Sequence, residues 1–221
     1  MTGRPRDEQA RNVILRRAAD IASRNGLEGL SIGGLSGELG LSKSGLFGYF
    51  GSKEELQLAT VRAAAQVFIT EVVQPALSTP PGLERVWRLC ESWLTYSQRR
   101  VFPGGCFFFT VAAEFEARPG RVRDAVAAAV LDWRRLVART VEDARQLGQL
   151  IEVADAEQLA FELIAFMETA NSVSLLHDEA VAYLRARTAI QARLRTLATD
   201  HTALPWALSS PVGDAPRTGR R

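Results

Sequence analysis

The sequence predicts an all-α protein in which a small N-terminal unit of three helices precedes a larger helical domain. Two observations carry this prediction. From about residue 7 to residue 200, apolar residues recur at spacings of three and four, the period of an amphipathic helix, and no alternating strand pattern interrupts them. Residues typical of helix ends then divide this stretch into segments that are short at first and longer after residue 82.

The N-terminal helices are defined by an apolar stripe and by their end signals. The first helix carries an apolar stripe at spacings of three and four, formed by Val13, Ile14, Arg17, Ala18 and Ile21, and it stops at Asn25-Gly26. Ser52 and Glu55 form a capping box that starts the fourth helix. The second, third and fourth helices are expected over 31–39, 42–50 and 53–73, the last of them ending before Pro75.

The longer helices follow the segment STPPG at 78–82. They are expected over 82–100, 104–117, 119–147, 156–176 and 179–199. The tail 201–221 is rich in Pro, Gly and Arg, and we expect it to be disordered. These elements divide the chain into a domain over 1–56 with an N-terminal arm over 1–8, a second domain over 57–200, and the tail.

Composition excludes several classes of protein. The 221 residues are 47% hydrophobic and 24% charged, as in ordinary proteins with a buried core. Cys90 and Cys106 have no CxxC spacing and the chain has two histidines, so we expect no disulfide framework, no metal site and no cofactor. The N-terminus lacks the apolar run of a secretory signal, and the longest apolar run, around CFFFTVAA, is shorter than the ~18–20 residues of a membrane span. A cytoplasmic protein without a membrane partner is expected.

The segment 31–50 has the geometry of a helix-turn-helix, whose second helix enters the major groove of DNA. Residues 1–53 carry eight Lys and Arg against five Asp and Glu, a net charge of +3, and both lysines of the chain, Lys43 and Lys53, lie here. The small residues Ser42, Ser44 and Gly45 allow the helix backbone to approach DNA closely. Lys43 in the first turn can reach a guanine edge or a phosphate.

The stretch LSIGGLSGELGLSKSGLFGYFGSKEEL resembles the DNA-binding signature of the tetracycline-repressor (TetR) family of bacterial transcription regulators. The resemblance is carried by Ser31, the Gly40-Leu41-Ser42 turn, SGLFGYF and SKEEL, and it is specific over residues 10–58. The phrase GGCFFFTVAAEFEARPGRVRDAV also resembles a C-terminal pattern of some of these regulators. The resemblance implies an N-terminal helix-turn-helix domain followed by a larger helical domain for ligand binding and dimerisation.

The resemblance also implies which residues lie near DNA. These are Ser31, Ser42, Lys43, Ser44, Gly45, Phe47, Tyr49 and Lys53, together with an N-terminal arm containing Arg4 and Arg6. The alternative for both lysines is a solvated surface charge, and for the arm a free terminus. We assign Leu35, Leu39, Leu41, Leu46 and Phe50 to the core of the small domain rather than to DNA.

A ligand pocket among the fourth to seventh helices is a further implication of the resemblance. Candidate lining residues are Trp87, Cys90, Phe107, Thr110, Glu114 and Trp133. Most aromatic residues of this domain are nevertheless expected in its core, and the alternative for Glu114, the candidate polar anchor, is a solvated surface position. Their character favours an apolar or aromatic small-molecule effector. Cys106 is either a redox switch or a buried, inert thiol.

The last two helices carry more apolar residues than one side of a bundle needs, which suits a four-helix homodimer interface. The expected interface residues are Leu159, Leu163, Phe166, Ala170, Val173, Tyr183, Leu184 and Leu194. A monomeric bundle is the alternative.

The sequence thus predicts a homodimeric TetR-type regulator, a repressor that binds a palindromic double-stranded DNA operator and that a small molecule releases. Neither HExxH, GxSxG, GxxxxGK[ST] nor GxGxxG occurs in it, which argues against an enzyme. A helical module that binds a ligand or a protein without sequence-specific DNA binding is the remaining alternative.

Overall fold

A computed structural model describes residues 5–201, 204 and 206, without the side chains of residues 5 and 6. In this part of the chain helices dominate, and the only extended pairing is a single bridge between Leu150 and Ala198. The elements are α1 (Pro5–Asn25), α2 (Ile32–Leu39), α3 (Lys43–Phe50), α4 (Lys53–Phe68), η1 (Ile69–Val73), α5 (Gln74–Leu77), α6 (Leu83–Gln98), α7 (Phe107–Phe115), α8 (Arg121–Gln146), α9 (Ala156–Leu176) and α10 (Val181–Leu197).

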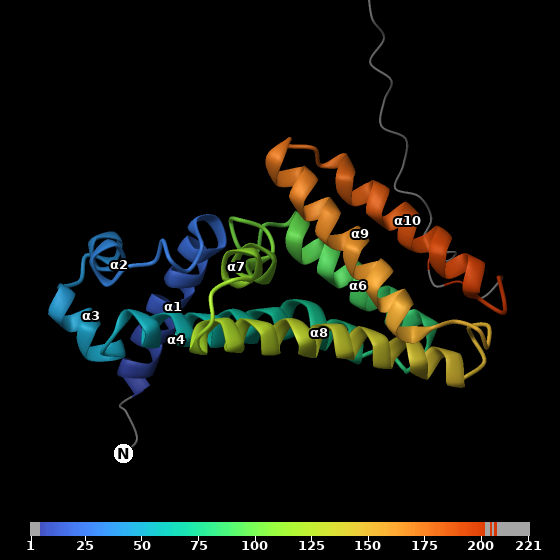
Figure 1. Cartoon of the computed structure of the whole chain (residues 1–221), viewed down its shortest axis with the longest axis horizontal. Coiled ribbons are helices and arrows are strands. Elements are labelled where there is room, and N and C mark those ends of the chain that lie inside the picture. Colours follow the sequence, from blue (N-terminus) through green and yellow to red (C-terminus); the bar gives the residue numbers. More distant parts are fainter. Residues whose placement is uncertain (1–4, 202–203, 205, 207–221) are drawn as a thin grey trace, which may run out of the picture.

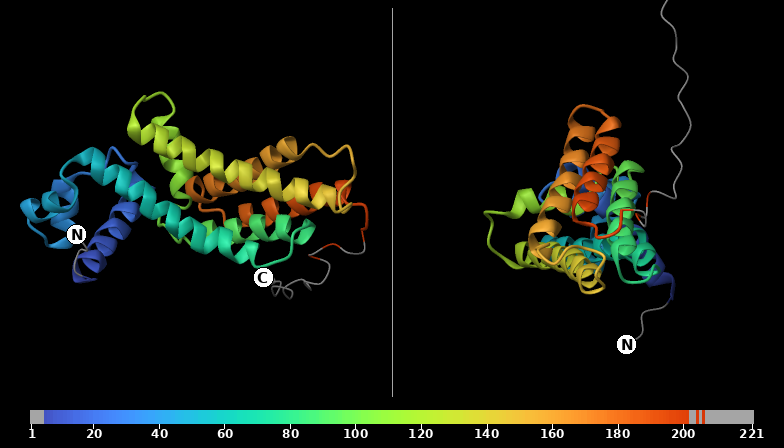
Figure 2. Two further views of the ribbon diagram at one scale, coloured as in Figure 1. Left: turned by 90° about the horizontal axis from the view of Figure 1, so that it is seen from below. Right: turned by 90° about the vertical axis from the view of Figure 1, so that its right-hand side faces the viewer.

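The molecule is elongated, with α2 and α3 at one end and α9 and α10 toward the other (Figure 1). The helix α4 leads away from the small N-terminal unit and runs beside α8, while α7 stands between α1 and the larger helices. Figure 2 shows the same separation from below, so the end that carries α3 lies far from the α9–α10 pair. This all-α architecture confirms the predicted fold class.

Serine caps start the three helices α2, α3 and α4. The hydroxyls of Ser31, Ser42 and Ser52 accept hydrogen bonds from the backbone N–H three residues later, at 3.0, 3.0 and 3.1 Å. Each bond satisfies one of the N–H groups that a helix start leaves free, and a serine cap typically contributes about 1 kcal/mol. The helix starts predicted from the sequence are confirmed here by local chemistry.

The turn between α2 and α3 explains one wrong prediction. Gly40 adopts a left-handed conformation (φ 63°) and the N–H of Leu41 donates to the carbonyl of Ser36 at 3.0 Å, which closes α2. This closure leaves the Leu41 side chain 43% exposed, so Leu41 does not belong to the core as expected. Leu35, Leu46 and Phe50 are buried and Leu39 is partly buried against them.

The fourth helix continues further than predicted. Instead of ending before Pro75, the helical backbone passes through the π-turn η1, where the N–H of Gln74 donates to the carbonyl of Ile69, and continues into α5. Pro75 follows directly after this π-turn, in the first turn of α5, a position where proline is tolerated better than in the interior of a helix.

Two residues of the predicted tail are packed. Leu204 is 4% exposed and Trp206 9% exposed, with the Trp206 ring 5.3 Å from that of Trp87. Both positions lie within the stretch expected to be disordered, and the indole of Trp206 packs against α6. The other residues of the tail after His201 lie outside the described part of the chain.

Two helical stretches, Lys53–Leu77 and Ala156–Leu176, are long and apolar enough to meet a length-and-composition criterion for a membrane span. The most apolar windows of these stretches are 50% and 44% buried inside the fold, and core helices of globular proteins meet the same criterion. Polar residues interrupt both stretches, so neither contains a long unbroken apolar run.

A close backbone contact joins the end of α1 to the loop before α7. The N–H of Gly104 donates to the Ser23 hydroxyl at 3.0 Å, and a Cβ added at Gly104 would lie 1.9 Å from the Ser23 carbonyl oxygen. Only glycine fits, because the obstructing atom belongs to the backbone.

We predict that Gly104→Ala destabilises the protein by about 1–3 kcal/mol, the usual cost of forcing extra volume into a packed site. The matched control is Gly37→Ala in α2, where a Cβ meets nothing within 4 Å and alanine should stabilise the helix by about 1 kcal/mol. Chemical denaturation of both variants measures the difference. Equal stability of the two variants would contradict the steric argument.

Candidate DNA-binding face and ligand cavity

The outer surface of α3 carries the residues expected at DNA. Phe47 is 55% exposed and Tyr49 36%, although rings of this size are usually buried. Lys43, Ser44 and Gly45 are exposed in the first turn of the helix. On the opposite face of α3, Leu46 and Phe50 are buried in the core of the small domain. One face of the helix is therefore packed and the other is exposed to solvent.

The two lysines differ in their surroundings. Lys43 forms no hydrogen bond or ion pair with any described residue, and its stem lies close to Gly33 of α2. Lys53 donates from Nζ to the backbone carbonyl and the Oε2 of Glu28, at 2.9 and 3.0 Å. This contact, with that of Gln57, holds the pKa of the Glu28 carboxyl below its usual value. Lys43 is therefore the more available cation.

Two of the expected DNA contacts cannot be placed. Arg4 lies outside the described residues, and Arg6 is at the start of α1 without a described side chain. Ser31 and Ser42 use their hydroxyls as helix caps, so any contact of theirs with phosphate would share the oxygen with a backbone N–H.

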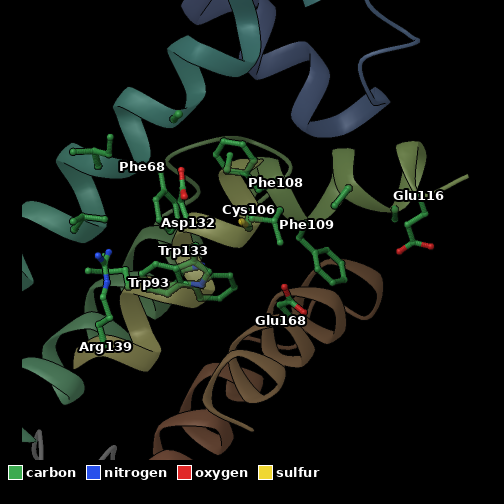
Figure 3. A pocket seen from close by; sticks show the side chains of 18 residues that line it. Phe68, Trp93, Cys106, Phe108, Phe109, Glu116, Asp132, Trp133, Arg139 and Glu168 are labelled. Carbon is green, nitrogen blue, oxygen red and sulfur yellow. The ribbon is translucent and has the colours of Figure 1, made fainter. Parts of the chain in front are cut away.

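A cavity of about 540 Å³ lies within the larger domain (Figure 3). Its walls come from α4, η1, α6, α7, α8 and α9 and are mainly apolar, with the aromatic residues Phe68, Trp93, Phe108, Phe109 and Trp133. Several of these rings meet edge to face, with Phe68 and Trp133 5.1 Å apart at 83°. The size and character of this cavity are typical of small-molecule sites.

The cavity contains only one of the six residues proposed from the sequence, Trp133. Cys90 and Phe107 are fully buried in the core, and Trp87 packs against Trp206. Thr110 and Glu114 lie on α7 outside the lining. Helical spacing places residues on a face but does not say whether that face meets a neighbouring helix or an open space, and this is why the aromatic core and the cavity wall were not distinguished.

The thiol of Cys106 lines the cavity but is buried. Burial raises the pKa of the Cys106 thiol to about 12, so the thiol stays protonated at neutral pH. This favours the inert thiol over a redox switch.

Ionisable groups of the cavity fall into two sets. Glu116, Asp132 and Arg139 are exposed, whereas Glu168 on α9 is partly buried. Burial raises the pKa of the Glu168 carboxyl above its usual value. Glu168 was not among the residues expected at the pocket, and its only signal in the sequence is that it is the single Asp, Glu, Lys or Arg between Glu162 and Asp178.

Glu114 joins the larger domain to the small one. Its carboxylate accepts hydrogen bonds from the backbone N–H groups of Leu27 and Glu28, at 2.7 and 2.9 Å, just after α1 ends. Gly26 beside it has a left-handed φ of 72°, and a Cβ there would lie 2.4 Å from the carboxylate, so a larger residue would strain the backbone and displace the carboxylate. We call this arrangement the Glu114 clamp. Arg121 of α8 adds a second link through Glu54 and Glu55 of α4, at 3.0 and 2.8 Å.

Most residues expected at a dimer interface are buried within the chain itself. Leu159, Leu163, Ala170, Tyr183 and Leu194 are at most 3% exposed, and Phe166 and Val173 are partly buried, which leaves Leu184 at 61%. The exposed apolar side chains of this helix pair are instead Phe161, Leu175, Leu176, Val181 and Leu184. Both faces of α9 and α10 are apolar in sequence, so periodicity alone could not say which one packs inward.

We predict that Glu114→Gln lowers the free energy of unfolding by about 1–3 kcal/mol. One of the two acceptor oxygens becomes an amide NH2 that cannot accept from a backbone N–H, and the hydrogen bond that remains is no longer charge-assisted. Urea denaturation measures the change. Glu116→Gln is the matched control on the same helix turn, since its side chain is exposed and has no hydrogen bond or ion pair to a described residue. Indistinguishable curves for the two variants would show that the clamp does not stabilise the fold.

Comparisons with known proteins agree with this arrangement. The model for bacterial regulatory proteins of the tetR family matches residues 14–60, and the model for the tetracyclin repressor-like C-terminal domain matches residues 82–190. None of the curated proteins compared with the sequence matches it.

Solved structures share the fold. A TetR transcriptional regulator from Chloroflexus aurantiacus is 24% identical over 87% of this chain and 97% of its own, with a TM-score of 0.80. A protein from Saccharomonospora viridis in complex with choline is 23% identical over 87% and 100%, with a TM-score of 0.73. AibR, in complex with isovaleryl coenzyme A and operator DNA, is 18% identical over 87% and 97%, with a TM-score of 0.66. With both family models matched along the helices described above, the chain belongs to the TetR family of bacterial transcription regulators.

Proposed function

We propose that the chain is a cytoplasmic, non-enzymatic repressor that binds a palindromic operator as a homodimer and leaves it when a small molecule occupies the cavity. The observation that carries this proposal is the exposed face of α3, where Lys43, Phe47 and Tyr49 face solvent. The other face of the helix is packed into the core through Leu46 and Phe50. Residues 1–56 would bind DNA and residues 57–200 would bind ligand and partner, with α4 crossing the boundary.

Ligand and DNA would be coupled through two helices. Helix α4 begins directly after α3 and reaches the cavity through Ala65 and Phe68. Helix α7 contributes Phe108, Phe109, Ala112 and Ala113 to the cavity and holds the small domain through the Glu114 clamp. A ligand that shifts either helix would change the spacing of two recognition helices, which must lie ~34–36 Å apart to read successive major grooves.

The loss of DNA affinity that a ligand can cause is set by how much more tightly it binds the DNA-free arrangement of the protein than the DNA-bound one. A ligand lowers DNA affinity only if it binds the DNA-free arrangement more tightly, and a ~100-fold change needs ~2.7 kcal/mol of coupling. Solved relatives bind chemically unlike ligands, choline in one and isovaleryl coenzyme A in another, so the fold alone does not identify the effector. The aromatic cavity supports an effector with an apolar or aromatic body.

We predict that Lys43→Ala weakens binding to the selected operator by about 1–3 kcal/mol and relaxes sequence preference, because its amine is free to reach a base edge. The operator is obtained by selection from random duplexes and by testing the DNA beside the gene, and fluorescence anisotropy across a salt series gives affinities. Lys53→Ala and Tyr49→Ala are the comparison variants, expected to weaken binding to all DNA alike. Equal losses for Lys43→Ala on operator and random DNA would exclude base readout, and wild-type protein without sequence preference would favour a ligand- or protein-binding module.

We predict that Leu184→Glu converts the dimer to monomers and abolishes cooperative operator binding. Leu184 is 61% exposed beside other apolar side chains of α9 and α10, an unusual surface for a monomer, and a buried unpaired carboxylate would oppose association. Light scattering after gel filtration measures the mass. Leu147→Glu, at an equally exposed leucine (57%) after α8, is the matched control and should leave the dimer intact. A monomeric wild-type protein would refute the proposed interface.

A further inference from the structure

We propose that the cavity is specific for hydrophobic organic monocations, with the positive group of the ligand against the carboxylate of Glu168 and its apolar body among the aromatic rings. The inference deepens the proposed function and rests on it for the regulatory consequence. The binding specificity itself depends only on the residues of the cavity.

Glu168 is a partly buried carboxyl group in the wall of the cavity, and no opposite charge lies against it among the described residues. It lines the cavity from α9 and forms no hydrogen bond or ion pair with any described residue. The neighbouring carboxylate on the same helix, Glu162, is paired with Arg193, which lowers its pKa. Figure 3 shows Glu168 reaching from α9 toward Phe109, with Arg139 on the other side of the cavity.

A carboxylate in such a place favours a cationic guest. Removal from water disfavours the charged form, and burial accordingly raises the pKa of Glu168. An ammonium group brought in by a ligand would supply the missing opposite charge and hydrogen-bond donors. A neutral ligand would leave the carboxyl group uncompensated, and an anionic one would be repelled by it.

The remaining wall suits the body of such a ligand. Phe68, Trp93, Phe108, Phe109 and Trp133 provide apolar area, and ring faces carry the partial negative charge that attracts cations. The volume of about 540 Å³ accommodates a ligand with a ring or a branched chain in addition to its charged group.

Other charged groups of the cavity were considered from each wall. Glu116 follows directly after α7, and α8 contributes Asp132 and Arg139; all three are exposed, and the Cys106 thiol is protonated. Water screens the exposed groups more strongly than it screens Glu168. Arg139 is the group that would instead recognise an anionic ligand, so the experiment must include one.

The test uses three probes with one skeleton and different charge: 4-phenylbutylammonium, 4-phenylbutan-1-ol and 4-phenylbutanoate. Trp93 and Trp133 line the cavity, so tryptophan fluorescence of the full chain can follow binding, with calorimetry as confirmation. We expect the cation to bind at least tenfold more tightly than the alcohol, and the carboxylate more weakly than both. An alcohol or a carboxylate that binds as tightly as the cation would overturn the proposal.

Glu168→Gln is nearly isosteric and removes the charge. We expect it to abolish the preference for the cation while affinity for the alcohol remains unchanged. Glu116→Gln and Asp132→Asn are the matched controls, at exposed carboxyl groups of the same cavity, and should retain the preference. If the preference for the cation persists in Glu168→Gln and disappears in either control, the cation binds at an exposed carboxyl group instead of at Glu168, and the inference is overturned.

A pH series on the unaltered protein gives a second readout that needs no variant. The ammonium probe stays charged below pH ~10, near the ~10.4 of a lysine amine. Cation binding should therefore weaken as pH falls through the raised pKa of Glu168, because protonation removes the charge that the ligand needs, while alcohol binding stays constant. Cation affinity that is independent of pH from 4 to 8 would contradict the assignment.

Failure of the inference and failure of the proposed function give different results. Cation binding with the Glu168 dependence, in a protein without sequence-specific DNA binding, would support the inference and refute the repressor. Operator binding that is intact in a protein whose cavity prefers the alcohol or the carboxylate would do the reverse.

Discussion

The structure depends on the hydrogen bonds that one carboxylate makes across the junction of the two domains. The backbone after α1 must turn back toward α2, which leaves the N–H groups of Leu27 and Glu28 without helical partners, and Glu114 of α7 accepts both. Since Glu28 also holds Lys53 at the start of α4, α1, α4 and α7 meet at this point. The orientation of α3 therefore depends on residues of the larger domain and not only on its own small core.

The features that could be predicted from the sequence are those set by residues close together in the chain. Serine caps at Ser31, Ser42 and Ser52 and the glycine that ends α2 act within three or four residues, so helix limits and the helix-turn-helix were accessible. The π-turn before Pro75 was not, because a helix can pass such a proline in more than one way.

The cavity and the exposed face of α9 and α10 depend on distant packing. Trp87 and Trp93 lie on the same helix and are both largely buried, yet Trp93 borders the cavity and Trp87 contacts an indole from near the chain end. No spacing rule separates them. Glu168 gave a weak signal that could have been used, since an acidic residue within an apolar helix is rarely buried without a purpose or a partner.

The position of the clamp on α7 has a consequence for the evolution and the engineering of such a sensor. Ala113 faces the cavity and the next residue, Glu114, holds the small domain, so a change of ligand preference made on this helix also disturbs the output. Val130 and Leu136 of α8 face the same cavity without touching that junction. On α8 the residue that links to α4, Arg121, lies nine positions before Val130, whereas on α7 the cavity residue and the clamp residue are adjacent. Helix α8 is therefore the side from which a biosensor for a new ligand could be selected with less disturbance of its DNA response.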